Sequence, residues 1–323
     1  MKNTYIFGPV CSRRLGRSLG IDLLPFKTCS YNCVYCECGS TTRLTSERAE
    51  FFPVNDVIAE LDSVLSKNPA LDYVTFAGSG EPTLSLSLGT IITFIKTHYP
   101  QYRVAVLTNG SLLTDAGVRS DLARADLVIP TLSSTCQKTF EKIHRPSPGL
   151  MIDRIISGLA KFRKEYPGWI WLEVFLVPSF NTGDEELSGL KEAIRAIHPD
   201  RIQLNTLDRP ATESWVEAPG PSDLHRIQHY FERTGIPVDV IGPAVLMPES
   251  GEWDNAVREK ILTTIRIRPC TVEDLAAMTG VHHQQISKYL AGLYATGRVR
   301  AERGARGVFY SAATDNANQH KEP

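Results

Sequence analysis

The chain has 323 residues, a length that usually divides between two domains rather than forming one hydrophobic core. Hydrophobic residues make up 42% of it and charged residues 22%, a composition that excludes wholesale disorder. No apolar run approaches the roughly 20 residues that span a bilayer. The first residues, Met1 to Tyr5, lack the apolar stretch of a signal peptide. We therefore expect a cytoplasmic protein with no membrane partner, whose net charge of −1 neither requires nor excludes a nucleic acid.

The first predicted strand covers residues 20–25 and ends just before a group of cysteines. A basic, glycine-containing loop over residues 12–17 precedes this strand. Its charged side chains fit either a solvated turn or a contact with an anion, and the sequence leaves both interpretations open.

Three cysteines follow the strand at a fixed spacing, Cys29, Cys33 and Cys36. Four of the seven cysteines fall between Cys29 and Cys38, and core packing gives no reason for that crowding. Thiolates are the ligands that hold iron–sulfur clusters, and such clusters normally take a protein ligand at every iron. Three cysteines would therefore leave one iron open to bind a reactive ligand.

Two other interpretations compete with an iron–sulfur site. The spacing i, i+4, i+7 also describes one buried face of a helix that carries inert thiols. A structural zinc site with Cys38 as fourth ligand is the stronger rival, but zinc sites usually pair two short Cys-x-x-Cys hooks far apart in sequence. In a reducing cytoplasm, clustered cysteines are more often metal ligands or redox groups than disulfides.

Helices and strands alternate along the next part of the chain. Helical periodicity over residues 54–65 and 88–98 is interleaved with apolar strands. The predicted strands cover residues 73–77, 103–107, 126–132, 169–177 and 201–207. Together with the first strand they make six βα steps, and their near-continuous apolar character is typical of parallel strands buried on both faces. We therefore predict an α/β fold, a partial (β/α)6 barrel of parallel strands.

Polar residues recur where these strands end, and the carboxyl ends of barrel strands form the active site. Besides the cysteines they are Glu81, Asn109, Ser133, Asn205 and Asp208. Each alone fits a loop cap or a turn, but their recurrence at successive strand ends indicates a site. Glu173 differs because it lies inside an apolar strand, where a carboxylate must face a wet interior or be paired. A functional role and a structural pairing are equally open for it.

The character of the sequence changes after residue 241. Before that point, the sequence indicates a loop with three prolines, then a helix over residues 222–234 and a strand-like stretch over 237–241. We predict a barrel domain over residues 1–245, a linker over 246–253, a second domain over 254–312 and a disordered tail over 313–323.

The second domain is predicted to be a winged helix-turn-helix. Its predicted helices cover residues 255–267, 271–278 and 283–296, and its predicted strands cover 297–301 and 307–311. His282 and His283 fit a turn or a cap better than a metal site. The basic residues of this domain from residue 281 onward are Lys288, Arg298, Arg300, Arg303 and Arg306, against the single acid Glu302. They favour contact with the phosphates of RNA or DNA, although winged helices also bind proteins.

With these features in place, the chain resembles the radical S-adenosylmethionine (SAM) superfamily over about residues 5 to 245. Cys29, Cys33 and Cys36 coincide with its Cys-x-x-x-Cys-x-x-Cys motif, with Tyr35 at the usual aromatic position. Gly78-Ser79-Gly80-Glu81 looks like its Gly-Gly-Glu element.

Within the superfamily the chain looks most similar to an uncharacterised branch grouped with wyosine synthases. The matching segments are Gly8-Pro9-Val10, Ser12 to Gly16, Gly80 to Thr83, Thr108-Asn109-Gly110 and Gln203 to Pro210. Wyosine synthases hold a second cluster on three further N-terminal cysteines, whereas this chain has only Cys11 upstream of Cys29. Where the branch usually has Ser-Leu-Asp, this chain has Thr131-Leu132-Ser133.

The resemblance implies a [4Fe-4S] cluster on the three cysteines, with SAM chelated at the open iron. One electron would then cleave the C–S bond of the sulfonium, and the resulting 5′-deoxyadenosyl radical would abstract a hydrogen from the substrate. Flavodoxin or ferredoxin is the kind of electron donor implied. The cofactor-binding residues implied are Tyr35, Gly78, Gly80, Glu81, Asn109 and Ser133, and the candidates that face the substrate are Glu173, Asn205 and Asp208.

Three functions fit these residues. An RNA base is the favoured substrate, because of the branch and the basic second domain. A small metabolite or peptide is the alternative, and the non-enzyme rival is an iron–sulfur regulator that binds DNA through the second domain.

Overall fold

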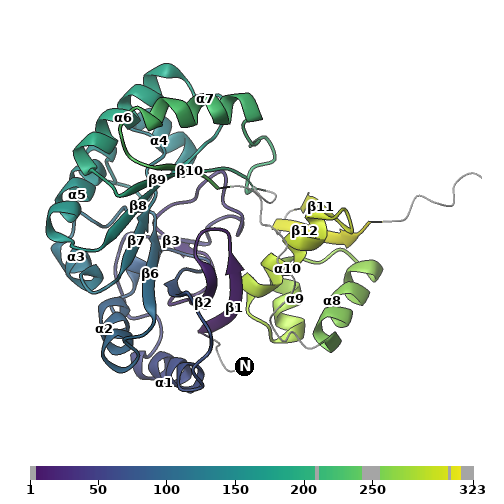
Figure 1. Cartoon of the computed structure of the whole chain (residues 1–323). Coiled ribbons are helices and arrows are strands. Elements are labelled where there is room, and N and C mark those ends of the chain that lie inside the picture. The colour runs from purple at the N-terminus through teal and green to yellow at the C-terminus, as the bar shows by residue number, and fades with distance from the viewer. Residues whose placement is uncertain (1–4, 208–210, 242–254, 305–306, 314–323) are drawn as a thin grey trace, which may run out of the picture. The chain divides into compact units, whose positions relative to one another are not determined.

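The computed structural model describes residues 5–207, 211–241, 255–304 and 307–313 of the chain (Figure 1). The chain divides into two compact units, Met1–Val245 and Leu246–Pro323, each with its own hydrophobic core. The predicted linker over residues 246–253 and residues 314–323 of the predicted tail lie outside the described residues.

The first unit is built on an eight-stranded sheet in the order β1-β2-β5-β6-β7-β8-β9-β10. β1 is antiparallel to β2, and every other neighbouring pair in this sheet is parallel. The strands are β1 (Ile6–Ser12), β2 (Gly16–Ile21), β5 (Tyr73–Phe76), β6 (Arg103–Thr108), β7 (Leu127–Pro130), β8 (Trp169–Phe175), β9 (Arg201–Asn205) and β10 (Val238–Val240). Two short segments, β3 (Thr28–Cys29) and β4 (Arg43–Leu44), form a separate parallel pair.

Helices connect the parallel strands and cover the outer face of the curved sheet (Figure 1). They are α1 (Val54–Leu65), the 3-10 helix η1 (Pro82–Leu84), α2 (Leu88–His98), α3 (Ala116–Leu122), α4 (Gln137–His144), α5 (Ile152–Glu165), α6 (Asp184–Ile197) and α7 (Pro221–Glu232). No helix in the described parts of the chain combines the length and apolarity that a bilayer crossing requires.

The predicted α/β class with a parallel sheet is confirmed. Five of the six predicted strands pair in parallel close to their predicted bounds, whereas the first, predicted over residues 20–25, is β2 over Gly16–Ile21 and overlaps the prediction only at residues 20 and 21. The strand-like stretch over residues 237–241 adds β10 as a seventh parallel strand. β1 is a strand that the sequence pattern does not predict, because Gly8 and Pro9 interrupt its apolar residues. Much of the basic loop over residues 12–17 is the hairpin turn between β1 and β2.

The two faces of the sheet have different surroundings because side chains alternate along a strand. On β8, Ile170, Leu172 and Val174 join the large core that the helices cover. Trp171 on the opposite face packs against a small apolar cluster of Leu15, Ala105, Leu127 and Ile129. Glu173 shares that inner face by the same alternation, so polar side chains can gather inside the curved sheet.

The second unit consists of three helices followed by an antiparallel hairpin. They are α8 (Asn255–Ile267), α9 (Val272–Thr279), α10 (His283–Ala295), β11 (Val299–Gly304) and β12 (Gly307–Ala312). A capping box between Thr271 and Asp274 starts α9, and Gly280 ends it in a left-handed conformation at φ +71°.

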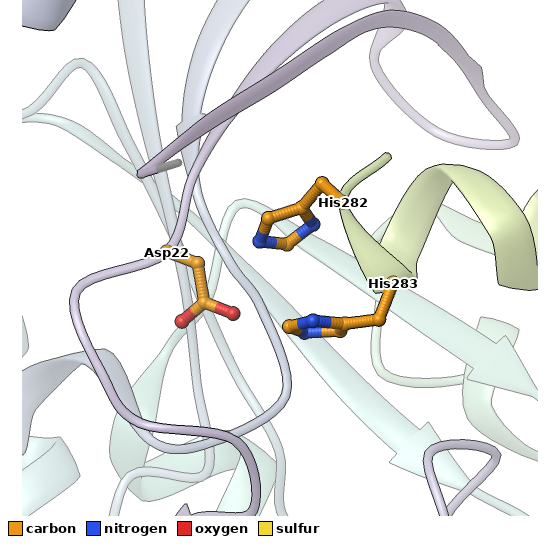
Figure 2. Close-up of side chains that lie close together, drawn as sticks. All are labelled: Asp22, His282 and His283. Atoms are coloured by element: carbon orange, nitrogen blue, oxygen red, sulfur yellow. The ribbon is translucent and has the colours of Figure 1, made fainter. Parts of the chain in front are cut away.

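The start of α10 is fixed by His282, which accepts a hydrogen bond from the Gln284 N–H at 3.2 Å. The ring of His283 lies against that of His282, with centroids 4.1 Å apart (Figure 2). The predicted capping role is therefore confirmed for His282.

Phe162 on α5 is fully buried in the first core, whereas Lys161 beside it is exposed. Phe162→Ala should lower the free energy of unfolding by about 3–5 kcal/mol, because it leaves a cavity among helices and sheet. Lys161→Ala on the same helix should cost no more than about 0.5 kcal/mol. Urea unfolding of the full chain measures both changes, and equal losses would show that this packing does not stabilise the first unit.

Candidate functional site

The cysteine loop, residues 28–36, begins where the chain leaves β2, on the carboxyl side of the parallel sheet. Backbone hydrogen bonds hold it from two sides. On one side, the Thr45 N–H donates to the Cys29 carbonyl at 3.0 Å. On the other, the Val34 N–H donates to the Ile143 carbonyl at the end of α4, at 2.9 Å. The loop is therefore fixed between the β3–β4 pair and α4 rather than exposed as a free connection.

Each cysteine sulfur has a side-chain nitrogen within hydrogen-bonding distance, and each nitrogen comes from a different part of the fold. Asn109 Nδ2 lies 3.6 Å from Cys29 Sγ, His144 Nδ1 lies 3.3 Å from Cys33 Sγ, and Lys27 Nζ lies 3.0 Å from Cys36 Sγ. Nitrogen donors of this kind orient metal-bound thiolates and adjust their electronic properties. Neither Lys27 nor His144 stands out in the sequence: Lys27 merely precedes the cysteine motif, and His144 lies 111 residues beyond Cys33.

The thiols are close enough to influence one another. Burial raises the pKa of Cys29 to about 12, and the nearby Glu81 carboxylate adds to the shift. Burial also raises the pKa of Cys33. A hydrogen bond from Cys38, together with the Lys27 ammonium, holds the pKa of Cys36 well below its usual range. Three crowded thiols of this kind fit an iron–sulfur cluster, which supplies the positive charge that three thiolates need.

Cys38 contacts Cys36 and is partly buried, like the three cysteines of the motif. This position is compatible with a hydrogen-bonding thiol. Cys11 belongs to β1 and pairs with Arg17 across the hairpin.

Glu81 lies beside the cysteine loop, after β5, and is 2% exposed. Its Oε1 accepts three hydrogen bonds, from the Thr83 N–H at 3.1 Å and from the hydroxyls of Thr83 and Thr108 at 2.6 Å each. Within the described parts of the chain, its Oε2 accepts only the Asn109 N–H, at 2.6 Å. Burial raises the pKa of this carboxyl. Oε2 therefore keeps acceptor capacity for a cationic ligand.

The glycines before Glu81 allow the chain to pass very close to its neighbours. A Cβ at Gly80 would lie 2.0 Å from the Thr28 carbonyl oxygen, and one at Gly78 would lie 2.2 Å from the Asp22 carboxyl carbon. Asp22, drawn in Figure 2, accepts from the Ser79 N–H at 3.2 Å. Close packing therefore explains why glycine stands at both positions. Their predicted contacts with a cofactor stay predictions.

Asn109 connects the end of β6 to the cysteine loop. Its Nδ2 donates to Ser30 Oγ at 2.8 Å, and its Oδ1 accepts from the Ser111 N–H at 3.0 Å. The side chain therefore positions the loop, and its predicted contact with adenosine stays a prediction.

Tyr35 stacks on Phe175 with ring centroids 3.8 Å apart and an interplanar angle of 8°. Its hydroxyl lies 3.4 Å from His144 Nδ1. Burial lowers the pKa of His144 to about 3, so its imidazole is neutral. These rings form one wall beside Cys33.

The remaining predicted residues form a second group around β8, whose Phe175 stacks on Tyr35 of the cysteine loop. Ser133 is fully buried, and its Oγ accepts from the Phe175 N–H at 3.0 Å. This bond gives Ser133 a structural role, and its cofactor contact stays a prediction. Asp208 lies outside the described residues.

Glu173 is paired inside the curved sheet. Its carboxylate forms an ion pair with Arg14, which reaches in from the β1–β2 hairpin. It also accepts from Thr131 Oγ1 at 2.9 Å and from Asn205 Nδ2 at 3.1 Å. Of the two interpretations of Glu173, the structure supports the paired one. The anion that the basic loop contacts is therefore a carboxylate of the chain itself.

A cavity of about 620 Å³ opens on this inner face, between the β1–β2 hairpin and strands β8 to β10. It is lined by Arg13, Arg14, Trp171, Arg201, Gln203, Gln228, Val238, Asp239, Val240 and Ile241. Arg201 forms a double hydrogen bond with Asp239, at 2.7 and 2.8 Å, which offsets part of the positive charge.

Fold and site together define an α/β protein with a mostly parallel sheet and three clustered thiols at the carboxyl ends of its strands. A family model of the radical SAM superfamily matches residues 23–190. The chain therefore belongs to the radical SAM superfamily, whose enzymes use a [4Fe-4S] cluster and SAM. This membership supports an enzyme over an iron–sulfur regulator.

The chain also has relatives of known sequence, UPF0026 proteins among them. The chain is 36% identical over 230 residues to a UPF0026 protein of Methanocaldococcus jannaschii, with 71% of each chain covered. It is 34% identical over 273 residues to a UPF0026 protein of Helicobacter pylori, covering 83% of this chain and 86% of that one. A protein of Brachyspira hyodysenteriae named GTPase Obg is 39% identical over 305 residues, but this chain spans only 44% of its length.

Solved structures share the fold. A radical SAM methyltransferase from Sphaerobacter thermophilus superposes with a TM-score of 0.52 at 18% identity, covering 69% of this chain and 65% of that one. SuiB of Streptococcus suis bound to S-adenosylmethionine gives a TM-score of 0.52 at 15% identity, covering 69% and 50%.

The Arg14–Glu173 pair yields a test of the inner face. Arg14→Met should lower the free energy of unfolding by about 3–5 kcal/mol, because it leaves a buried carboxylate without its cation. Arg14→Met combined with Glu173→Met should recover a large part of that loss. Denaturant unfolding of the full chain measures both. A double variant that loses as much as the two single variants together would show that the pair is not coupled.

Proposed function

We propose that the chain is a radical SAM enzyme in which Cys29, Cys33 and Cys36 hold the [4Fe-4S] cluster. The observation that carries this proposal is the convergence of the three thiols with the buried Glu81 carboxylate at the carboxyl ends of neighbouring strands. When bound, the cluster and SAM supply reductive C–S cleavage and a 5′-deoxyadenosyl radical, with one electron from a donor such as flavodoxin or ferredoxin.

Glu81 is proposed to bind the ammonium group of SAM. Three donors fix its Oε1, while Oε2 has one protein donor and capacity for another. A charge-assisted hydrogen bond from an ammonium group would use that capacity and favour the ionised carboxylate.

Apolar side chains beside the cysteines are proposed to keep water from the radical. Val34 of the cysteine loop packs in one buried cluster with Ile143, Phe175, Val177, Ala211 and Val216. Tyr35 and Phe180 pack against the same cluster. This wall reaches the cysteine loop directly, because Val34 lies between Cys33 and Cys36.

An RNA base is the proposed substrate class. The second unit has the element order of a winged helix, with three helices followed by a hairpin. Arg298, Arg300 and Arg303 are exposed along and just before β11. Lys288 lies on α10, and Arg306 lies outside the described residues. Exposed arginines on such a hairpin suit phosphate contacts.

A small metabolite or peptide is a second candidate, favoured by the cavity on the inner face. Its volume of about 620 Å³ is in the range of sites for small molecules. Its lining combines Trp171 and two glutamines with arginine side chains, of which Arg14 and Arg201 are paired with Glu173 and Asp239.

Replacement of the cysteines tests the cluster assignment. Cys29→Ala, Cys33→Ala or Cys36→Ala should abolish cluster loading and the formation of 5′-deoxyadenosine with dithionite, because each removes one of three ligands. Cys136→Ala is the matched control, since Cys136 is exposed at the start of α4. Iron and sulfide analysis and chromatography of the SAM products measure the two effects. A loaded Cys33→Ala protein that still cleaves SAM would refute the assignment.

The RNA proposal yields a separate test. Arg298→Ala with Arg300→Ala should weaken binding of an unmodified tRNA transcript and reduce the slope of log Kd against log salt by about 1–2, because two phosphate contacts are lost. Arg266→Ala with Arg268→Ala removes two exposed arginines in and beyond α8 and serves as the control. Equal effects of the two double variants would argue against this surface.

The substrate itself is tested by comparing modified nucleosides in RNA from a deletion strain and its parent. Loss of one nucleoside supports the RNA base. An unchanged nucleoside profile would instead leave the metabolite or peptide as the candidate to pursue.

A further inference from the structure

Lys27 places a buried cation beside the cysteine loop. It is 3% exposed, and its Nζ lies 3.0 Å from Cys36 Sγ. Among the described residues, no carboxylate forms an ion pair with it, and Cys36 is its one hydrogen-bonding partner through the side chain. A buried ammonium group normally requires a negative partner, because removing it from water costs several kcal/mol. A neutral thiol is a weak acceptor and cannot meet that cost.

The backbone holds Lys27 in place. Its φ of +56° lies in the left-handed region, which is uncommon for a residue other than glycine. Its N–H donates to Ser79 Oγ at 3.4 Å, and its carbonyl accepts from the N–H groups of Thr42 and Arg43 at 3.0 and 3.1 Å. The side chain is therefore directed toward Cys36 by a constrained backbone.

The other two cysteines have neutral donors instead. Asn109 contacts Cys29, and the neutral imidazole of His144 contacts Cys33. Among the side-chain nitrogens that contact the three sulfurs in the described part of the chain, Lys27 is thus the charged one. A cluster on these cysteines would supply a Cys36 thiolate as the missing counter-charge.

We propose that Lys27 is a positioning residue that acts as the resident counter-cation of the cluster and raises its reduction potential. This inference rests on the proposed cluster ligands. The electron for reduction comes from the external donor, and the ammonium keeps its proton throughout. A fixed positive charge stabilises the reduced cluster more than the oxidised one, because the reduced cluster carries one more negative charge.

The test compares the full-length wild type with Lys27→Met, which removes the charge at similar length, and Lys27→Arg, which keeps it. Lys96→Met is the matched control, because Lys96 pairs with Asp126 just before β7, at the amino ends of the strands. After anaerobic reconstitution, iron and sulfide are quantified, and the reduction midpoint is measured without SAM by potentiometry followed by electron paramagnetic resonance.

Lys27→Met should keep its cluster and show a more negative midpoint than the wild type, Lys27→Arg and Lys96→Met. A fully loaded Lys27→Met protein with the wild-type midpoint would overturn the inference. If Lys27→Met does not load a cluster, loading of Lys27→Arg supports the charge, and equal failure of both variants overturns it. A wild type that binds no cluster refutes the proposed function as well, whereas a wild type that cleaves SAM beside an unshifted Lys27→Met refutes only the role of Lys27.

Discussion

The site depends on one buried carboxylate, that of Glu81. A charge removed from water needs several hydrogen bonds, and four donors converge on Glu81 from η1 and the end of β6. The Glu81 N–H in turn donates to the Thr28 carbonyl at 3.2 Å, an approach that only glycine at position 80 permits. Satisfying this carboxylate therefore fixes the ends of two strands and the start of the cysteine loop together.

The inner face of the sheet holds a second buried carboxylate, which is stabilised by an ion pair as well as by hydrogen bonds. Glu173 is buried inside the curve of the sheet, and its cation comes from Arg14, 159 residues earlier in the chain. Thr131 and Asn205 supply the remaining hydrogen bonds. Because these groups are occupied with one another, the polar residues of β8 and β9 stabilise the inner face.

Local patterns in the sequence predicted the helices and strands, but they could not predict contacts between residues that lie far apart in the chain. Apolar runs located the parallel strands, and the spacing of the cysteines located the loop, because both depend on neighbouring residues. The strand β1 lacks such a pattern and is stabilised by pairing with β2. Arg14 meets Glu173, His144 meets Cys33 and Lys27 meets Cys36 only in the folded chain. No spacing in the sequence therefore identifies these contacts. For the same reason the sequence left Glu173 undecided.

The charges around the cysteine loop also bear on its ligand. Glu81 raises the pKa of Cys29, so a thiolate there and the carboxylate repel each other. Lys27 offsets negative charge on the side of Cys36 but does not pair with Glu81. A cation bound between Glu81 and Cys29 would remove the remaining repulsion. SAM carries both an ammonium and a sulfonium group, so the buried Glu81 carboxylate is complementary in charge to the ligand that the proposed function assigns to this site.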